Sequence, residues 1–227
     1  GIRDVERSRG LGDVYKRQAQ YAIDSGSREL LLTSQDNGAF GADNDSNLEN
    51  LLNELSHLEG DFRLRVGMLN PMLVAGRSEK MARAWSDNRT YKFMHLPIQS
   101  GSQTMLDAML RDHILEDFWE VVEPFRSHYP EVMIITDVIT GFPGETDEDH
   151  LATIKLLRRL LPDLVNITRF SPRTGTQDVA APAASNPAST ATSAPTSQTF
   201  RKRFSCFCLT IFPAPRLKKT AFRSRPP

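Results

Sequence analysis

Residues Thr136–Thr146, TDVITGFPGET, continue the apolar run Met133–Ile135 and predict one strand, loop and helix. A β-branched segment that stops at Gly-Phe-Pro-Gly is typical of a buried strand entering a turn. Thr146 with Asp149 three residues later resembles a capping box, and acidic residues in the first turn suit the helix dipole. The buried face of that helix is predicted from its apolar spacing to be Leu151, Ile154, Leu157, Leu160 and Leu161.

The loop of this unit is a candidate ligand site. In α/β folds, ligands bind at the carboxyl ends of the strands, which is where this loop falls. Gly141 and Gly144 let backbone approach a ligand closely, and Pro143 stiffens the turn. The alternative is a tight turn that binds nothing.

The same pattern extends outward along the chain. Helical patterns separate five predicted strands, and parallel strands need such crossover connections. A helix predicted from Leu115 to Arg126 contains Pro124, which should kink it or end it early. The predicted strands are Glu29–Thr33, Arg63–Met68, Tyr91–Ile98, Met133–Ile139 and Leu164–Thr168.

The predicted fold class is α/β, and two architectures fit it. One is an open doubly wound sheet and the other is a partial (βα) TIM-like barrel. Every predicted strand is followed by a polar or glycine-bearing loop, which favours the barrel because one end of a barrel then carries the site. No GxGxxG follows the first strand, so a Rossmann dinucleotide site is excluded.

Charge and composition divide the chain into three segments. Residues 19–176 carry 15 Lys/Arg against 24 Asp/Glu and form the predicted globular domain. Residues 1–18 lack a helical or strand period, and Arg7–Gln18 resembles a translated sequencing adapter, although a basic N-terminal arm is the alternative. Residues 177–227 begin with a stretch rich in Ala, Ser, Thr and Pro and end in a basic run, so we predict a disordered tail.

The cellular setting is predicted from what the sequence contains. Apolar runs are shorter than the roughly 18 residues of a membrane helix, so no membrane partner is expected. The chain has 2 cysteines, Cys206 and Cys208, both in the tail, which argues against a disulfide framework and for the cytoplasm.

Three strings in order carry a family resemblance: His95–Ser102 (HLPIQSGS), Thr136–Asp149 (TDVITGFPGETDED) and Thr168–Thr176 (TRFSPRTGT). Together they resemble the catalytic domain of radical SAM methylthiotransferases, which install a methylthio group on tRNA or on a ribosomal protein. Leu32–Gly41 (LTSQDNGAFG) and Arg65–Pro71 (RVGMLNP) are most similar to the archaeal and eukaryotic type. That type acts on C2 of threonylcarbamoyladenosine in tRNA. The resemblance covers about residues 20–176.

The resemblance implies a partial barrel with S-adenosylmethionine across its strand ends, and tRNA as partner. Gln35 and Asp36 would face the methionine end or the substrate, and Gln99 and Ser100 would meet the ribose. Amide and hydroxyl groups suit these hydrogen bonds. The remaining expected cofactor contacts are Ile139 and Gly141 near the adenine, Arg169 and Phe170 closing the same edge, and Asp137 on the strand.

Structural alternatives remain for three polar residues of these strings. Asp137 can be a buried, hydrogen-bonded structural carboxylate as readily as a ligand contact. His95 is better interpreted as a packed strand residue than as a base, and Glu145 as a charge at a helix N-terminus.

The departures from the family concern its metal centre. The family holds a 4Fe-4S cluster on a CxxxCxxC loop after the first barrel strand, and the cluster makes S-adenosylmethionine a source of the 5′-deoxyadenosyl radical. Such clusters need thiolate ligands, and residues 19–176 contain no cysteine. We therefore predict that this chain lacks the first strand, holds neither metal ligands nor catalytic residues, and is inactive alone. The family also continues into a basic RNA-binding domain, whereas the composition here changes beyond Thr176, which suggests a frameshift or a basic RNA-binding arm.

Two further functions remain open. A non-catalytic module that binds S-adenosylmethionine or nucleic acid fits the same fold. A lyase-type barrel would need a lysine or a cluster of His and carboxylates at the strand ends, and the sequence places neither there. The donor of the sulfur is not specified by the sequence.

Overall fold

The computed structural model describes residues 14–42, 46–172 and 208–213. A helix at residues 14–24 precedes the first strand. The elements that follow are β1 (Ser27–Thr33), η1 (Asn37–Ala39), α2 (Leu48–Leu55), β2 (Arg63–Val66), α3 (Pro71–Val74), α4 (Ser78–Ala84), β3 (Phe93–His95), α5 (Gln103–Ala108), α6 (Leu115–His128), β4 (Met133–Thr140), α7 (Asp147–Leu160), β5 (Leu164–Arg169) and β6 (Cys208–Pro213).

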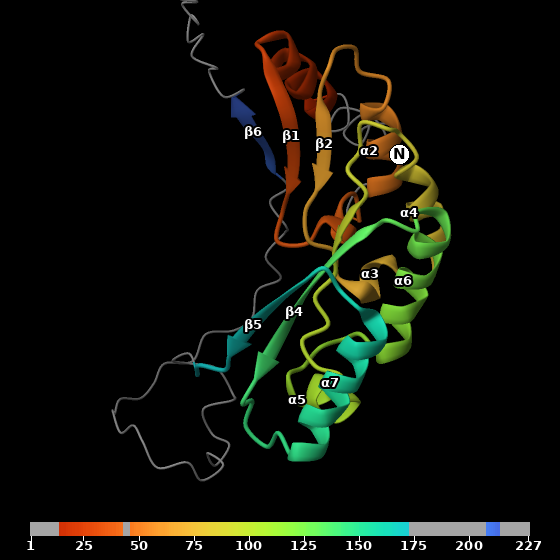
Figure 1. The fold of residues 1–227 in the computed structure, drawn as a ribbon. Coiled ribbons are helices and arrows are strands. Elements are labelled where there is room, and N and C mark those ends of the chain that lie inside the picture. Colours follow the sequence, from red (N-terminus) through yellow and green to blue (C-terminus); the bar gives the residue numbers. More distant parts are fainter. Residues whose placement is uncertain (1–13, 43–45, 173–207, 214–227) are drawn as a thin grey trace, which may run out of the picture.

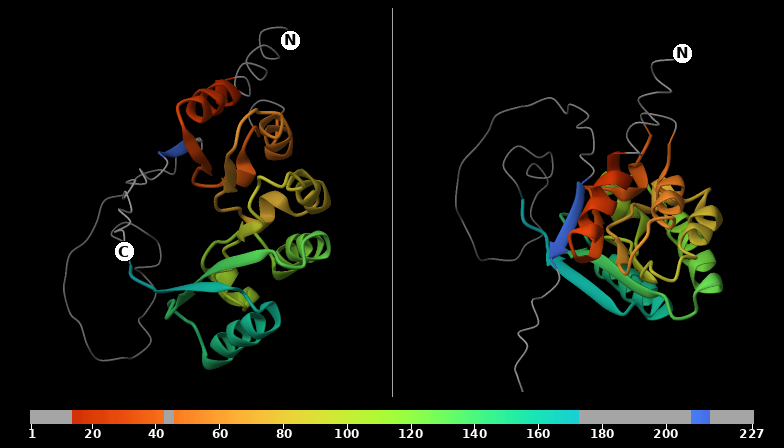
Figure 2. Two further views of the ribbon diagram at one scale, coloured as in Figure 1. Left: turned by 45° about the horizontal axis from the view of Figure 1, so that its top comes forward. Right: turned by 90° about the horizontal axis from the view of Figure 1, so that it is seen from above.

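Five parallel strands stand side by side in chain order. β1 pairs with β2, and β3, β4 and β5 form a second parallel ladder. The two ladders meet where Leu64 bridges Thr90 and where the Leu69 N–H donates to the His95 carbonyl, 2.9 Å away. Figures 1 and 2 show the strands as a curved row with helices along its outer side. The predicted partial (βα) barrel is confirmed, and the described strands do not close into a full barrel.

The alternation of side chains along the strands separates the core from the concave face. Leu30 and Leu32 on β1 and Ile134 and Val138 on β4 are buried in the hydrophobic core against the helices. Because side chains alternate along a strand, residues between them, such as Asp137, face the concave side. The concave face of β4 therefore carries the Asp137 side chain, between Ile135 and Ile139.

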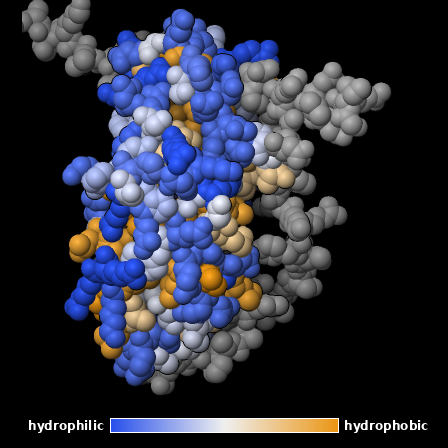
Figure 3. All heavy atoms as spheres, turned by 90° about the vertical axis from the view of Figure 1, so that its right-hand side faces the viewer, coloured by the Kyte–Doolittle hydropathy of each residue, from blue (hydrophilic) through white to orange (hydrophobic). Residues whose placement is uncertain are grey.

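Aromatic residues fill the core beneath the helices. Trp85, Phe118 and Phe125 are fully buried, and the rings of Trp85 and Phe125 meet edge to face with centroids 5.2 Å apart. Such pairs stabilise a core beyond the area they bury. The outer surface of the helices is mainly hydrophilic with scattered apolar side chains (Figure 3).

The helix after the opening stretch begins as predicted but turns a different face inward. Thr146 caps α7 and Asp149 completes the capping box. The buried residues are Thr153, Leu156 and Leu160, whereas Leu151 is 52% exposed and Leu161 is 75% exposed. The predicted face was wrong at these two leucines, because α7 packs through Thr153 against the backbone of Gly101.

Three other segments differ from the sequence-based expectations. α6 continues through Pro124 to His128, so the proline does not end the helix. The helix at residues 14–24 crosses the predicted boundary at residue 18. Within the predicted tail, residues 177–227, β6 pairs antiparallel with β1, and the other residues of that tail lie outside the described ranges.

Gly101 provides a test of the packing between α7 and the loop after β3. A Cβ at this position would lie 2.5 Å from the Thr153 Cα and 2.7 Å from the Ala152 carbonyl oxygen. Gly101→Ala should lower the free energy of unfolding by about 1–3 kcal/mol, because backbone atoms must move. Urea denaturation measures this. Lys155→Ala changes an exposed residue of α7 and is the control. Its free energy of unfolding should stay within about 0.5 kcal/mol of the wild type. Equal free energies of unfolding for the two variants would contradict the close contact at Gly101.

Candidate functional site at the strand ends

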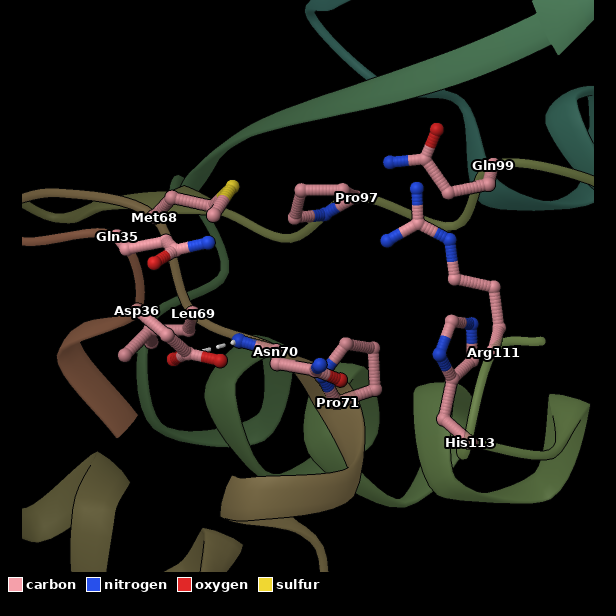
Figure 4. Close-up of a pocket in the computed structure, with 10 residues that line it drawn as sticks. All are labelled: Gln35, Asp36, Met68, Leu69, Asn70, Pro71, Pro97, Gln99, Arg111 and His113. Carbon is pink, nitrogen blue, oxygen red and sulfur yellow. Dashed lines mark hydrogen bonds between the residues drawn. The ribbon is translucent and has the colours of Figure 1, made fainter. Parts of the chain in front are cut away.

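The loops after β1, β2 and β3 enclose a cavity of about 230 Å³. Its walls combine amide, carboxylate and guanidinium groups with apolar side chains (Figure 4). The lining residues are Gln35, Asp36, Met68, Leu69, Asn70, Pro71, Pro97, Gln99, Arg111 and His113. The cavity thus lies where α/β barrels bind their ligands.

Asp36 ties the first two loops together. Its Oδ1 accepts hydrogen bonds from the backbone N–H of Gly38, at 2.9 Å, and of Asn70, at 3.2 Å. Burial raises the pKa of the Asp36 carboxyl, while the two N–H donors and Arg77 oppose that shift. Asp36 therefore holds the loop geometry that forms one wall of the cavity.

Asn37 fixes the same two loops from beneath. Its backbone N–H and its side-chain Nδ2 both donate to the Met68 carbonyl, at 3.0 and 2.9 Å. A Cβ at Gly67 would lie 2.9 Å from the Asn37 Nδ2, so glycine is needed for this approach. The Met68 side of the cavity is therefore rigidly placed.

Gln99 reaches the cavity from a strained backbone. Its φ is +69°, which is unusual for a residue other than glycine. Its N–H donates to the Asp137 carbonyl at 2.8 Å, and its own carbonyl accepts from the Ile139 N–H at 2.9 Å. These bonds hold the residue in place, and Figure 4 shows its carboxamide beside the Arg111 guanidinium.

Arg111 and His113 come from the segment between α5 and α6. Among the described residues, the Arg111 guanidinium has neither a hydrogen bond nor an ion pair. His113 is 2% exposed; its Nε2 lies 3.4 Å from the Ile98 carbonyl oxygen, and its Nδ1 has no partner in the described structure. Burial lowers the pKa of His113 and favours the neutral ring.

A polar row crosses the concave face of β3, β4 and β5. The Oδ1 of Asp137 accepts from Asn166 Nδ2 at 2.7 Å, and its Oδ2 lies 2.9 Å from His95 Nε2. Asp137 is thus a hydrogen-bonded carboxylate, and His95 is half-buried as a strand residue. Neither side chain lines the cavity.

The other predicted contacts lie at the ends of β4 and β5. Gly141 has a φ of +72° and open space where a side chain would stand. Its N–H donates to Glu145, so that carboxylate closes the turn. The rings of Phe142 and Phe170 stack edge to face at 4.8 Å. Ile139 and Arg169 share this end of the sheet, and none of these residues lines the cavity.

Ser100 is buried behind the cavity wall and contacts α7. The residue is 1% exposed, its hydroxyl lies 3.3 Å from the Thr153 Oγ1, and it accepts from the Ser102 N–H at 3.2 Å. The side chain therefore serves the contact with α7 in this structure, and its expected place at a ribose stays a prediction.

The described side chains suit S-adenosylmethionine but not a 4Fe-4S cluster. The described residues contain no group of three or more His, Cys, Asp or Glu side chains that could hold a metal ion. Within residues 14–42 and 46–172 there is no cysteine, so a 4Fe-4S cluster does not fit the described side chains. S-adenosylmethionine fits better, because unpartnered donors and amides line the cavity and Gly141 leaves room for a flat base.

Comparison with known families assigns the fold to a superfamily. A model described as the radical SAM superfamily matches residues 3–157. The chain belongs to the radical SAM superfamily. Among solved structures, the radical SAM enzyme coproporphyrinogen III oxidase from Escherichia coli is similar at a TM-score of 0.42 and 17% identity, over 55% of this chain and 27% of that chain.

Three relatives carry the methylthiotransferase name that the motifs predicted. A probable threonylcarbamoyladenosine tRNA methylthiotransferase from Archaeoglobus fulgidus is 46% identical over 72% of this chain and 39% of the relative. Its counterpart in Pyrococcus abyssi is 44% identical, over 69% of this chain and 37% of the relative. The Homo sapiens enzyme is 40% identical, over 70% of this chain and 28% of the relative. The chain thus spans well under half the length of these relatives.

The radical SAM family resemblance is confirmed by these comparisons, while the roles of individual residues stay predictions. The structure gathers Gln35, Asp36 and Gln99 at one cavity. Arg111 and His113 were missed because their segment has no strand or helix pattern. The string Arg65–Pro71, which carries part of the family resemblance, was the signal for Met68 and Asn70. No helix in the described part of the chain is long and apolar enough to cross a membrane.

Asp36 predicts a pH dependence of stability. Its pKa is raised in the folded chain, so the folded state binds more protons than the unfolded state just above the ordinary pKa of aspartate. Stability from this group is therefore present below the ordinary pKa and falls as the pH rises through the folded pKa. Asp36→Asn keeps an acceptor for Gly38 and removes this fall. Urea denaturation at a series of acid pH values should show that the variant gains stability relative to the wild type as the pH rises. Parallel pH profiles of the two proteins would contradict this prediction.

Proposed function

We propose that the protein acts in methylthio transfer to C2 of N6-threonylcarbamoyladenosine in tRNA, with S-adenosylmethionine and 4Fe-4S clusters as cofactors. One observation carries the proposal. The strings that resemble the threonylcarbamoyladenosine type, Leu32–Gly41 and Arg65–Pro71, supply most of one wall of the strand-end cavity. The names of the relatives agree with this substrate.

The strand ends offer separate groups for the parts of S-adenosylmethionine, which supplies radical chemistry in this superfamily. Gln35 and Asp36 would bind its amino-acid end, and the Gln99 carboxamide its ribose. Ile139 and Gly141 would lie beside the adenine, since the open Gly141 position lets a flat ring approach. Asp137, with Arg169 and Phe170, would close the remaining edge. These roles rest on position and on hydrogen-bonding chemistry.

The proposal also covers the cluster ligands, the tRNA partner and the cellular location. The described side chains provide no thiolate, so we expect this chain alone to be inactive and to incorporate no stoichiometric iron. tRNA is the proposed partner, and the cytoplasm is therefore the proposed location. A folded binding module without catalysis is the outcome to expect if the activity test below fails.

A chimera tests the function. In the Archaeoglobus fulgidus relative, the segment matched by this chain is replaced with residues 14–172. The chimera is expressed in cells whose tRNA carries threonylcarbamoyladenosine but not its methylthio derivative. Mass spectrometry of digested tRNA should detect the 2-methylthio nucleoside, because the relative supplies the cluster ligands and this chain the strand ends.

Two controls define the interpretation. The unmodified relative sets the full signal, and a chimera with its cluster cysteines changed to alanine sets the background. A folded, iron-loaded chimera that forms no methylthio nucleoside would reject the proposed function. Formation on a different nucleoside would reject only the substrate.

A further inference from the structure

The outer edge of β1 is filled by a strand from the far end of the chain. β6 pairs with β1 in antiparallel orientation, whereas the other strand pairs of the described residues are parallel. The register places Leu31 opposite Thr210 and Thr33 opposite Cys208. Figures 1 and 2 show β6 beside β1 at one end of the row of strands. β1 is therefore the inner strand of a three-stranded sheet in the order β2, β1, β6.

The sequence of β1 suits an inner strand and not an edge. Its C-terminal half, Leu30–Thr33, carries neither a charged residue nor a proline. Natural proteins use such residues to protect an exposed edge strand from pairing with other chains. Leu30 and Leu32 are also fully buried against the helices. Without a neighbour, β1 would thus offer an apolar, extended backbone with free N–H and C=O groups.

β5, at the other end of the row, has the residues of a true edge. It pairs with β4 alone among the described strands. Its polar and charged residues Asn166, Thr168 and Arg169 are all exposed. Charged residues on an edge oppose the addition of a further strand. The two ends of the row therefore differ, because β5 tolerates a free edge whereas β1 needs a neighbour.

The backbone groups of β1 alternate between its two neighbours. The Gly67 N–H, just beyond β2, donates to the Leu32 carbonyl at 2.9 Å, so the backbone groups of Leu32 face β2. Because alternate residues of a strand turn their N–H and C=O groups to opposite sides, those of Leu31 face β6. Thr210 is the partner of Leu31 in the register, so its own N–H and C=O groups face β1. The N–H of the next residue, Ile211, points away from β1.

We propose that the outer edge of β1 is a strand-accepting surface, and that residues Cys208–Pro213 of the same chain are its occupant. The surface binds an extended apolar segment through backbone hydrogen bonds, the mode in which a peptide adds a strand to an exposed sheet edge. The segment Leu209–Phe212 suits this role, because β-branched and aromatic residues favour strands, and Pro213 ends it. The surface is separate from the strand-end cavity and does not depend on the proposed function.

β6 and any strand that precedes β1 exclude each other at this surface. β1 to β5 stand side by side in chain order, so a preceding strand of the same repeat would pair at the outer edge of β1. The edge accepts one strand at a time, because its N–H and C=O groups are already paired when β6 is in place. β6 therefore has to leave before another strand can pair with β1.

Two proline variants of the full chain test the pairing. Thr210→Pro removes an N–H that faces β1, whereas Ile211→Pro removes one that faces away, where edge strands accept proline. NMR measures hydrogen exchange at each amide of β1. Thr210→Pro should speed exchange at Leu31 by at least about tenfold, because β6 detaches and the Leu31 N–H then faces water. Exchange at Leu32, which faces β2, should stay unchanged, and Ile211→Pro should resemble the wild type at both amides.

A peptide added in trans tests the surface itself. The peptide has the sequence of residues 205–216 and is added under reducing conditions to the wild type and to Thr210→Pro. It should restore slow exchange at Leu31 in Thr210→Pro, because the edge of β1 is then free. It should leave the wild type unchanged, because β6 already fills the edge. The same peptide carrying the Thr210→Pro change should restore nothing.

The exchange rates separate a filled edge from a free one. Equal exchange at Leu31 in the wild type and in Thr210→Pro overturns the pairing. Failure of the peptide to restore slow exchange in Thr210→Pro rejects a surface that accepts strands. Sedimentation should show a monomeric wild type. A dimer that dissociates in Thr210→Pro would assign the strand to a second copy and reject pairing within one chain.

The result is independent of the chimera experiment. The chimera carries residues 14–172 of this chain and therefore contains no β6, and the exchange measurement involves no catalysis. An active chimera together with unchanged exchange in Thr210→Pro rejects the strand-accepting surface and leaves the proposed function standing. An inactive chimera together with exchange that the peptide restores rejects the function and keeps the surface.

Discussion

The hydroxyl of Thr136 is the contact on which the strand-end geometry depends. It lies on the central strand β4, is fully buried, donates to the Leu96 carbonyl at 2.8 Å and accepts from the Ile98 N–H at 3.1 Å. Between those residues stands Pro97, which has no N–H to give to a ladder. Buried backbone groups must be paired, and here a side chain pairs them where the β3 backbone leaves regular pairing.

This departure of the β3 backbone from the ladder places Pro97 and Gln99 at the cavity wall. The backbone rejoins β4 at Gln99, through its bonds to Asp137 and Ile139. Pro97 and Gln99 both line the cavity as a result. The positive φ of Gln99 is held by these neighbours, which is how strained backbone persists at functional sites. The opposite wall is fixed in a similar way by Asp36 and Asn37, so the cavity is built on rigid loops.

The electrostatics of the cavity follow from that rigidity. One carboxylate oxygen of Asp36 accepts hydrogen bonds from backbone N–H groups. The Arg111 guanidinium and the Nδ1 of His113 have no hydrogen-bond partner in the described structure. Leaving buried polar groups unpaired costs free energy, which a complementary ligand would offset. A site of this kind discriminates strongly against ligands that lack the matching group.

The sequence by itself determined the order of strands and helices, the parallel partial barrel and the superfamily, because these follow from local patterns and short motifs. It also placed Gln35, Asp36 and Gln99 at the strand ends. Only the tertiary structure decided which face of α7 is buried, that Ser100 serves packing, and that Arg111 and His113 join the cavity. The physical reason is that these positions depend on contacts between residues far apart in the chain, such as Gly101 with Thr153, which periodicity does not encode.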